Sequence, residues 1–341
     1  MFNKINIFFQ SIVLVLIILC IISLGYGPVK ISLSQITNVL LYNLNLIDLA
    51  DINSFNQIHN TVLINIRFPR MILAILVGVG LGTSGAILQG LFRNPLVDPG
   101  FIGVSSGAAV GAMIAIMFSS IISSYLNPFL LPVLAMSGAF ITTILIYKMS
   151  KISNKTNIMV MLLSGIAINA LAGAIIGFFV SISTDAELRS FTFWTLGGLD
   201  SANWQLVAIM FLIIMSSYCI IHSFIDRMDV FMLGDSEAQH LGIDIEKLKK
   251  TIILISSIMV GISVSFCGMI GFIGLVTPHL IRLFIGPNHK YLIPGSALLG
   301  AVILLVSDLI SKTIMSPAQL PIGVVTSAIG APFFIWLIIN Q

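Results

Sequence analysis

The stretch TIILISSIMVGISVSFCGMIGFIGLVTPHLI, residues 251–281, decides the fold because it runs for 31 residues without a formal charge. A helix crosses the hydrocarbon of a bilayer with about 20 apolar residues at 1.5 Å each. The stretch is therefore long for one membrane-spanning helix and short for two. Its flanks settle the number, because basic residues concentrate in cytoplasmic loops.

Basic residues stand on both sides of this stretch, with lysines at 247, 249 and 250 before it and Arg282 and Lys290 after it. If both groups face the cytoplasm, an even number of helices must separate them. We therefore expect two helices over 251–285, the second short and beginning near Ile270.

Composition places the rest of the chain in lipid as well. Charged residues make up 9% of the 341 positions and hydrophobic residues 57%, whereas a soluble domain carries about 25% charged residues. So few charges cannot cover a water-facing surface of this size. The net charge of +3 therefore matters less than the positions of the charges along the chain.

The other uncharged runs are long enough for further spans. The run 99–147 should break at Asn127-Pro128 into two helices, and 5–29 is longer than the about 7–15 apolar residues of a signal peptide. We take 5–29 as a first span, with cleavage near Ser23-Leu24-Gly25 as the alternative. The remaining runs are 71–92, 156–184, 201–225, 291–307 and 313–341.

The predicted fold is an all-α polytopic membrane protein with about ten transmembrane helices, a single transmembrane domain over 1–341 and both termini in the cytoplasm. This topology places eleven Lys and Arg residues inside and five outside. The inner set is Lys4, Arg93, Lys148, Lys151, Lys155, Arg227, Lys247, Lys249, Lys250, Arg282 and Lys290, and the outer set is Lys30, Arg67, Arg70, Arg189 and Lys312.

Glycines predict close helix packing. Gly78 and Gly82, and likewise Gly103, Gly107 and Gly111, recur every four residues, which lets helix backbones approach each other in lipid. The G-x-G-x-x-G match at 80–85 is not a dinucleotide site, because no strand–helix–strand unit surrounds it. A repeat offset by 183 residues, seen in Gly85 and Gly268, is as well explained by chance.

Catalytic and metal-binding patterns are absent from the sequence. It contains no phosphate-binding G-x4-G-K-[ST], no H-E-x-x-H and no G-x-S-x-G. We expect no catalytic residues, no metal site and no cofactor. Asp308 is the one acid inside an apolar run, and it pairs locally with Lys312 or serves docking or gating. A single acid is too few for the ion relay of an ion-coupled transporter. If the chain moves a solute across the membrane, a partner protein must therefore supply the energy.

The longest charged segment, 226–250, is the candidate contact for that partner. Asp235 is predicted to cap a short helix on which Ala238 and Leu241 share a face, and Gly242 to end it in a left-handed conformation. Asp244 is then predicted to cap a second short helix leading to the lysines. The alternative is an ordinary solvated loop.

Several motifs in order resemble the permease subunits of ABC-type importers for iron chelates and vitamin B12. Arg67-Phe68-Pro69-Arg70 is similar to R-[LF]-P-R, and Asn94-Pro95-Leu96-Val97-Asp98-Pro99-Gly100 to N-P-L-[AV]-[DE]-P-G. Gly234, Asp235, Glu237, Ala238, Leu241 and Gly242 lie in a segment similar to the ATPase-coupling motif G-[DE]-x2-A-x2-L-G. Further family positions with a structural or gating role are Gly271, Gly274, Pro278, Pro321 and Gly323.

The resemblance implies a type II ABC importer architecture in the bacterial cytoplasmic membrane. The implied partners are two ATP-binding cassette ATPases, a second permease that is identical or paralogous, and an extracellular or periplasmic binding protein. Arg67 and Lys312 fall on positions that dock the binding protein, and Thr156–Met159 near a cytoplasmic gate. An iron–siderophore complex is the expected cargo, with haem or vitamin B12 as alternatives and an ion-coupled transporter as a remote one.

Overall fold

The computed structural model describes residues 2–44, 46, 57–119 and 127–339, and most of them are helical. The chain begins with α1 (Phe2–Gly25), α2 (Leu33–Asn43), α3 (Gln57–Thr61), the π-helix η2 (Val62–Arg67), α4 (Phe68–Leu91), the 3₁₀ helix η3 (Pro99–Ile102), α5 (Val104–Phe118) and α6 (Asn127–Met149). A two-stranded antiparallel hairpin follows, formed by β1 (Lys151–Ile152) and β2 (Lys155–Thr156).

The remaining elements are again helices. They are α7 (Ile158–Ile182), α8 (Asp185–Leu196), α9 (Trp204–His222), α10 (Ile225–Phe231), α11 (Asp235–His240), α12 (Ile245–Cys267), α13 (Ile273–Ile285), α14 (His289–Thr313) and α15 (Ile322–Ile339).

Seven helical segments among the described residues are long and apolar enough to cross a membrane, and three shorter apolar helices accompany them. The shorter ones lie at Val104–Phe118, Ile273–Ile285 and Ile322–Leu337. The all-α polytopic class is therefore confirmed, whereas the number ten stays a prediction.

The stretch 251–281 does contain parts of two helices, as predicted. Helix α12 ends at Cys267, and α13 begins at Ile273. Between them Gly268 has φ 69° and Phe272 φ 68°, a left-handed conformation that breaks a helix. The run 99–147 also divides, because α5 ends at Phe118 and α6 begins at Asn127.

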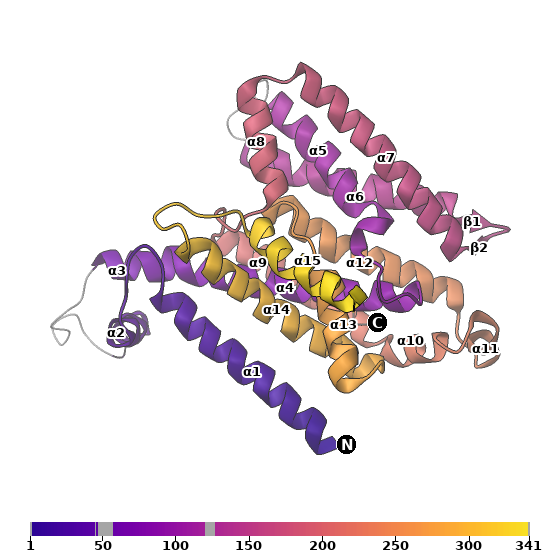
Figure 1. Ribbon diagram of the computed structural model, residues 1–341, viewed down its shortest axis with the longest axis horizontal. Helices are drawn as coiled ribbons and strands as arrows, with labels where there is room; N and C mark the ends of the chain where they lie inside the picture. Colours follow the sequence, from indigo (N-terminus) through magenta and orange to yellow (C-terminus); the bar gives the residue numbers. More distant parts are fainter. Residues whose placement is uncertain (1, 45, 47–56, 120–126, 340–341) are drawn as a thin grey trace.

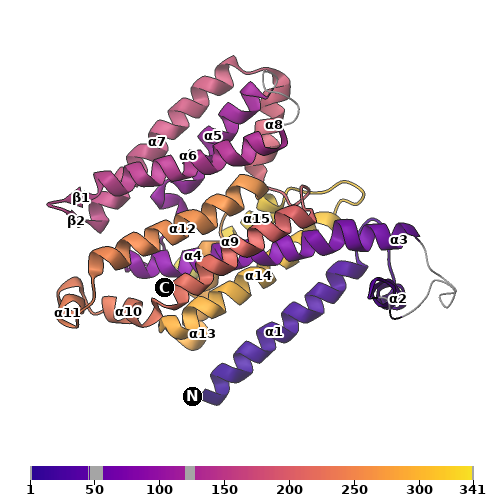
Figure 2. The same cartoon turned by 180° about the vertical axis from the view of Figure 1, so that it is seen from behind.

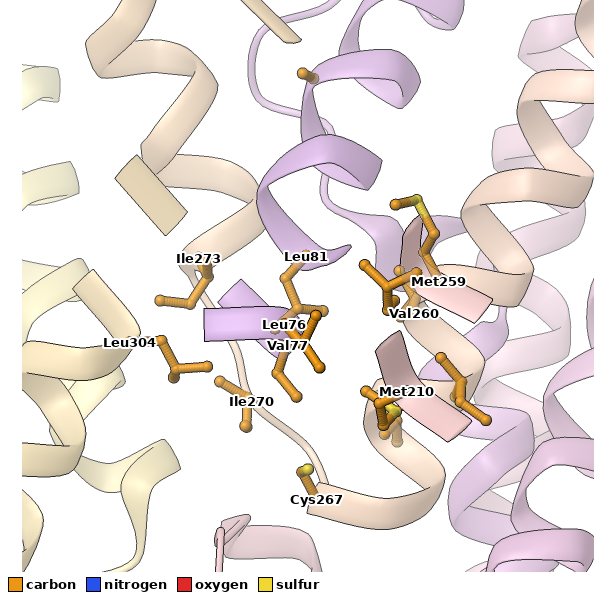
Figure 3. Packing of buried hydrophobic residues seen from close by; sticks show 14 of the residues in the cluster. Leu76, Val77, Leu81, Met210, Met259, Val260, Cys267, Ile270, Ile273 and Leu304 are labelled. Carbon is orange, nitrogen blue, oxygen red and sulfur yellow. The ribbon is translucent and has the colours of Figure 1, made fainter. Parts of the chain in front are cut away.

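Helix α4 is the centre of the molecule, and it packs against α9, α12, α13 and α14 (Figures 1 and 2). Twenty of its 24 residues are buried. Figure 3 shows its side chains between two groups of apolar partners. Leu76, Val77 and Leu81 face Met210, Met259 and Val260 on one side and Ile273 and Leu304 on the other.

Helix α12 packs on α5 and α6 as α4 packs on α13 and α14, so the same arrangement of elements occurs twice. The offset of 183 residues does not describe this repetition. Gly85 lies inside α4, six residues before its last residue, whereas Gly268 follows the end of α12.

The predicted small-residue contacts are present. A Cβ atom on Gly78 or Gly82 would collide with backbone atoms of Gly300 or Ser296 in α14. One on Gly107 or Gly111 would collide with the carbonyls of Gly138 or Leu134 in α6. The backbones of these helix pairs therefore touch, as close packing in lipid requires. The G-x-G-x-x-G match lies wholly within α4.

The helix ends form two separate ends of the molecule. The start of α1, the β hairpin, α10 and α11 lie toward one end, and α2, α3 and α8 toward the other (Figure 1). We name them the inner and outer ends after the predicted orientation. Met1 and Gln341, whose placement in the cytoplasm was predicted, lie outside the described residues.

We expect Gly82→Val and Gly107→Val to destabilise the protein by about 1–3 kcal/mol each or more, because overpacked backbones must separate. Gly173→Val in α7 is the matched control, since nothing lies within 4 Å of its added Cβ. Thermal unfolding of the detergent-solubilised variants checks this. Equal melting temperatures for all three would contradict the close packing.

Candidate functional site

The segment 226–250 forms α10, α11 and the first turn of α12 at the inner end. Two details differ from the prediction. Gly234 is the N-cap of α11 and no side chain caps it, so Asp235 is not a cap. Asp244 accepts a hydrogen bond from the Lys247 backbone N–H, as a cap should, but it caps the long helix α12 and not a second short one. Gly242 does adopt a left-handed conformation, with φ 81°.

Asp235 is not a cap because both of its carboxylate oxygens hold cations from elsewhere in the chain. Arg93 Nη2 donates to Oδ1 at 2.6 Å, and Lys249 Nζ donates to Oδ2 at 2.7 Å. The Arg93 guanidinium also lies 4.2 Å from the centroid of the Phe231 ring, within cation–π range. We call Arg93, Phe231, Asp235 and Lys249 the Asp235 cluster.

The electrostatics of the cluster favour the ionised carboxylate. Partial burial opposes ionisation of Asp235, but the hydrogen bonds and positive charges of Lys249 and Arg93 outweigh it, and they lower the pKa of Asp235 below its ordinary value. A depressed carboxylate pKa means that the pairing is complete at neutral pH and is lost as the pH falls through the folded-state pKa.

Further contacts extend from the cluster to two more membrane helices. Lys249 Nζ donates to the Thr156 carbonyl at 3.1 Å, and Thr156 donates through its N–H and hydroxyl to Glu246 at 2.9 and 2.7 Å. Thr156 lies two residues before the first residue of α7, next to its N-cap Asn157. In α10, Asp229 accepts from the backbone N–H of His289, the first residue of α14, at 2.9 Å, and it lies 2.6 Å from the His289 ring nitrogen.

These contacts join α10 and α11 to the inner ends of α4, α7, α12 and α14. A displacement of α11 must therefore move those ends or break charged hydrogen bonds. The predicted gate residues Thr156–Met159 belong to this connection, since Thr156 is buried and Asn157 caps α7.

The exposed side chains of α11 itself are polar, and two exposed leucines flank the helix. Ala238 is fully buried, whereas Leu241 is 65% and Leu233 67% exposed. Ala238 and Leu241 therefore do not share one environment. Glu237 is also exposed, and Gly234 and Gly242 flank the helix. A cleft of about 480 Å³ lies beside α11, and Gln239, Asp244 and Lys155 are among its lining residues.

The segment 94–100 is folded by its own side chains. The Asn94 side chain accepts from the Leu96 N–H at 2.9 Å, and Asp98 accepts from the Gly100 N–H at 2.8 Å, which caps η3 at Pro99. The Gly100 carbonyl then accepts from Asn169 in α7 at 3.2 Å. These contacts fix the connection from α4 to α5 against α7.

The glycines that the resemblance selected lie at two backbone contacts. A Cβ added to Gly274 would lie 3.1 Å from the Leu81 carbonyl oxygen, and one added to Gly323 would collide with the Leu196 carbonyl oxygen. Gly271 has open space around it. Pro278 lies inside α13, and Pro321 directly precedes α15.

Gln89 is a polar residue that the sequence analysis did not select. It is buried, it accepts a hydrogen bond from Arg282, and its amide lies 3.4 Å from the carbonyls of Val97 and Leu275. It joins α4, α13 and the segment before η3. A lone glutamine in an apolar run was the available signal.

At the outer end the predicted docking residues are buried. Arg67 is 7% exposed and donates to the carbonyls of Leu24 and Val29. Lys312 is 6% exposed and donates to the Ser23 hydroxyl at 2.9 Å. Both side chains hold the end of α1 and the residues after it. The docking role of Arg67 and Lys312 stays a prediction.

Asp308 forms the predicted pair with Lys312 at 3.3 Å, but its shortest contact is with Arg70 at 2.7 Å. Arg70 also reaches Asp200 and Gln319, each at 2.7 Å. We call Arg70, Asp200, Asp308, Lys312 and Gln319 the outer cluster. The sequence analysis missed Arg70 as a partner because 238 positions separate it from Asp308.

Among the residues that the structure describes, no group of three or more His, Cys, Asp or Glu side chains gathers as a metal site would require.

We expect Asp235→Asn to raise the hydrogen-exchange rate of the α11 amides by about tenfold. A partly exposed ion pair contributes roughly 1 kcal/mol or less to stability. The variant weakens two such pairs, those with Arg93 and Lys249. Glu237→Gln removes the same charge from the same helix without removing a hydrogen bond, so it is the control. Mass-spectrometric exchange checks both variants, and equal protection in both would refute the anchoring role of Asp235.

At the outer end we expect Asp308→Asn to destabilise the protein by about 3 kcal/mol, because it removes the carboxylate partner of the buried Lys312 and leaves the buried Arg70 with one carboxylate in place of two. Asp200→Asn loses the same partner, Arg70, but its side chain is 69% exposed, and it should cost under about 1 kcal/mol. Thermal unfolding compares the two. If Asp200→Asn lowered the stability as much as Asp308→Asn, the contribution of an ion pair to stability would not depend on its burial here.

Comparisons with known proteins agree on one family. The chain is 40% identical over 331 residues to the hemin transport system permease protein HmuU of Yersinia pestis, covering 97% of this chain and 94% of that protein. It is 37% identical to the cobalamin import system permease protein BtuC of Halobacterium salinarum, covering 80% of this chain and 72% of that one.

A solved structure described as an inward-facing conformation of a metal-chelate type ABC transporter matches with a TM-score of 0.83. It is 31% identical and covers 97% of this chain and 98% of that chain. The FecCD transport family matches over residues 15–340. The buried helix α4, the short inner helix α11 and these matches together identify the chain as a permease of the FecCD transport family.

Proposed function

We propose that this permease imports a bulky metal chelate, powered by ATP that separate partner subunits hydrolyse. The observation that carries the proposal is the Asp235 cluster. It ties one exposed short helix to helices that cross the membrane, and this is the arrangement required to receive a displacement from outside the membrane. The chain itself carries no phosphate-binding loop, so its energy must come from another subunit.

In this mechanism the ATPases move toward each other when they bind ATP and displace α11. Leu233 and Leu241 supply the exposed apolar contact, and Glu237 the exposed charge. The displacement passes through Arg93 to α4, through Lys249 to α12 and through Thr156 to α7. Rotation of α7 then opens the pathway to one side of the membrane and closes it to the other.

For the cargo we propose haem first. The 40% identical relative is named a hemin permease and matches nearly the whole chain, whereas a ferric siderophore was the expectation from the sequence. Cobalamin is supported by the name of the second relative. All three are large chelates, and for any of them tight binding within the path would slow release.

The proposed partners are two ATPase subunits at the inner end, a second permease, and a binding protein at the outer end. We propose that Arg67 and Lys312 serve docking indirectly. Their buried charges hold Ser23–Val29 in place, and this backbone then meets the binding protein. The excess of basic residues at the inner end supports a cytoplasmic location for it in the bacterial cell membrane.

We expect Leu241→Asp and Glu237→Lys to lower transport-linked ATPase activity at least tenfold, because they place a charge or a reversed charge at the ATPase contact. Proteoliposomes that contain both permease and ATPase subunits measure this. Leu241→Met keeps the apolar contact and should retain activity. Normal coupled activity in Leu241→Asp would exclude α11 as the coupling helix.

Uptake of haem, a ferric siderophore and cobalamin into the same proteoliposomes, each with its binding protein, tests the cargo. We expect ATP-dependent uptake of haem. Import driven by a proton or sodium gradient without ATP would overturn the mechanism, and uptake of another chelate alone would overturn only the choice of cargo.

A further inference from the structure

A narrow groove of about 110 Å³ lies between α6 and α12 near the inner end. Its floor is formed by Thr143, Ile253 and Ser257, which are at most 4% exposed. The two hydroxyls are 3.2 Å apart, and Thr143 also donates to the Ala139 carbonyl. Because these polar atoms already have partners, the groove presents an apolar surface.

The walls of the groove open to the surroundings of the protein. Ile144 and Leu254 are each 48% exposed, and Phe140 lies beyond them. The lining spans two helical turns on each helix, from Tyr147 to Phe140 and from Lys250 to Ser257. At 1.5 Å per residue this is a depth of about 10 Å. Lys250 and Tyr147 therefore stand at the mouth.

The mouth coincides with the boundary of the membrane. Lys148 is the first charged residue after the uncharged run 99–147, and Lys250 is the last before the run 251–281. The groove thus extends from the interface into the hydrocarbon. A soluble anion would gain nothing from its apolar walls, and a protein partner would have to enter lipid to fill it.

The charge at the mouth is positive and unneutralised by the described chain. Lys148, Lys151 and Lys250 are exposed, and no described residue forms an ion pair with any of them. Lys151 lies 5.0 Å from the centroid of the Tyr147 ring, which keeps its charge beside the groove. The nearby acids are already engaged, Asp235 with Lys249 and Glu246 with Thr156.

We propose that this groove binds an anionic phospholipid, with an acyl chain between α6 and α12 and the headgroup phosphate against Lys148, Lys151 and Lys250. Basic pockets between membrane helices near the cytoplasmic face bind anionic headgroups. The site lies one residue from Lys249, which holds α11 through Asp235, so the lipid contacts the first turn of α12 beside the coupling connection. The proposal needs the membrane placement of α6 and α12 and no particular cargo.

The test uses the full-length permease in phosphatidylcholine nanodiscs containing a photoactivatable phosphatidylglycerol or, separately, a photoactivatable phosphatidylcholine. Mass spectrometry then locates the crosslinks. We expect the phosphatidylglycerol to label the peptides around 140–147 and 250–257, in preference to phosphatidylcholine by at least fivefold, which is about the contribution of one lysine near the membrane surface. Equal labelling by the two lipids would overturn the proposal.

Variants separate the headgroup contact from the acyl-chain contact. The triple variant Lys148→Gln, Lys151→Gln and Lys250→Gln should lower labelling by phosphatidylglycerol at least about tenfold. Lys30→Gln with Arg189→Gln removes basic residues at the outer end and should change nothing. Leu254→Trp should block the groove although all three lysines remain, whereas Leu283→Trp, exposed on α13, should not.

Two further outcomes would refute the lipid assignment. Labelling that survives the triple lysine variant would show that the cations do not hold the headgroup. Labelling that disappears when the ATPase subunits are added would show that a protein surface covers the groove in the assembled importer. None of these measurements depends on transport, so failure of the proposed cargo or coupling mechanism would leave their interpretation unchanged.

Discussion

The fold depends on backbone-to-backbone contact of α4 with α14 and α13. Gly78, Gly82 and Gly85 leave no side chain between these helices, and carbonyl groups of the neighbours occupy the space where a Cβ would lie. In lipid, helices gain little from hiding apolar side chains, because the surroundings are equally apolar. Dispersion contacts at short backbone distance must therefore hold the bundle together. Such contacts are available only where glycine or another small residue occupies the face.

Helix α4 also connects the two charged clusters. Arg70 in its first turn belongs to the outer cluster with Asp308, and Arg93, two residues beyond its end, belongs to the Asp235 cluster. The 24 residues of the helix extend over about 36 Å. Close packing along most of its length opposes bending of this helix. The proposed docking end and the proposed coupling end are therefore linked by one element with a charged anchor at each end.

The inner end joins three kinds of surroundings within a few residues. Leu241 is exposed and is the proposed ATPase contact, Lys249 is buried and pairs with Asp235, and Lys250 stands at the mouth of the groove proposed to bind lipid. Lys249 and Lys250 have the same side chain and opposite environments because successive residues on a helix point about 100° apart. Residues 241–250 are thus the segment where the proposed ATPase contact, the helix bundle and the proposed lipid site come together.

The sequence by itself determined the membrane class, the division of 251–281 between two helices, the glycine contacts and the position of the short inner helix. These features follow from local composition, because lipid penalises charge and backbone breaks at every position. Only the tertiary structure decided that Asp235 pairs with Arg93 and Lys249 instead of capping α11, that Arg70 is the nearest partner of Asp308, and that Arg67 and Lys312 are buried. The partners of Asp235 and Asp308 include residues more than 140 positions away. A charge buried in a bundle pairs with the cation that packing brings close to it, and spacing along the chain does not reveal which cation that is.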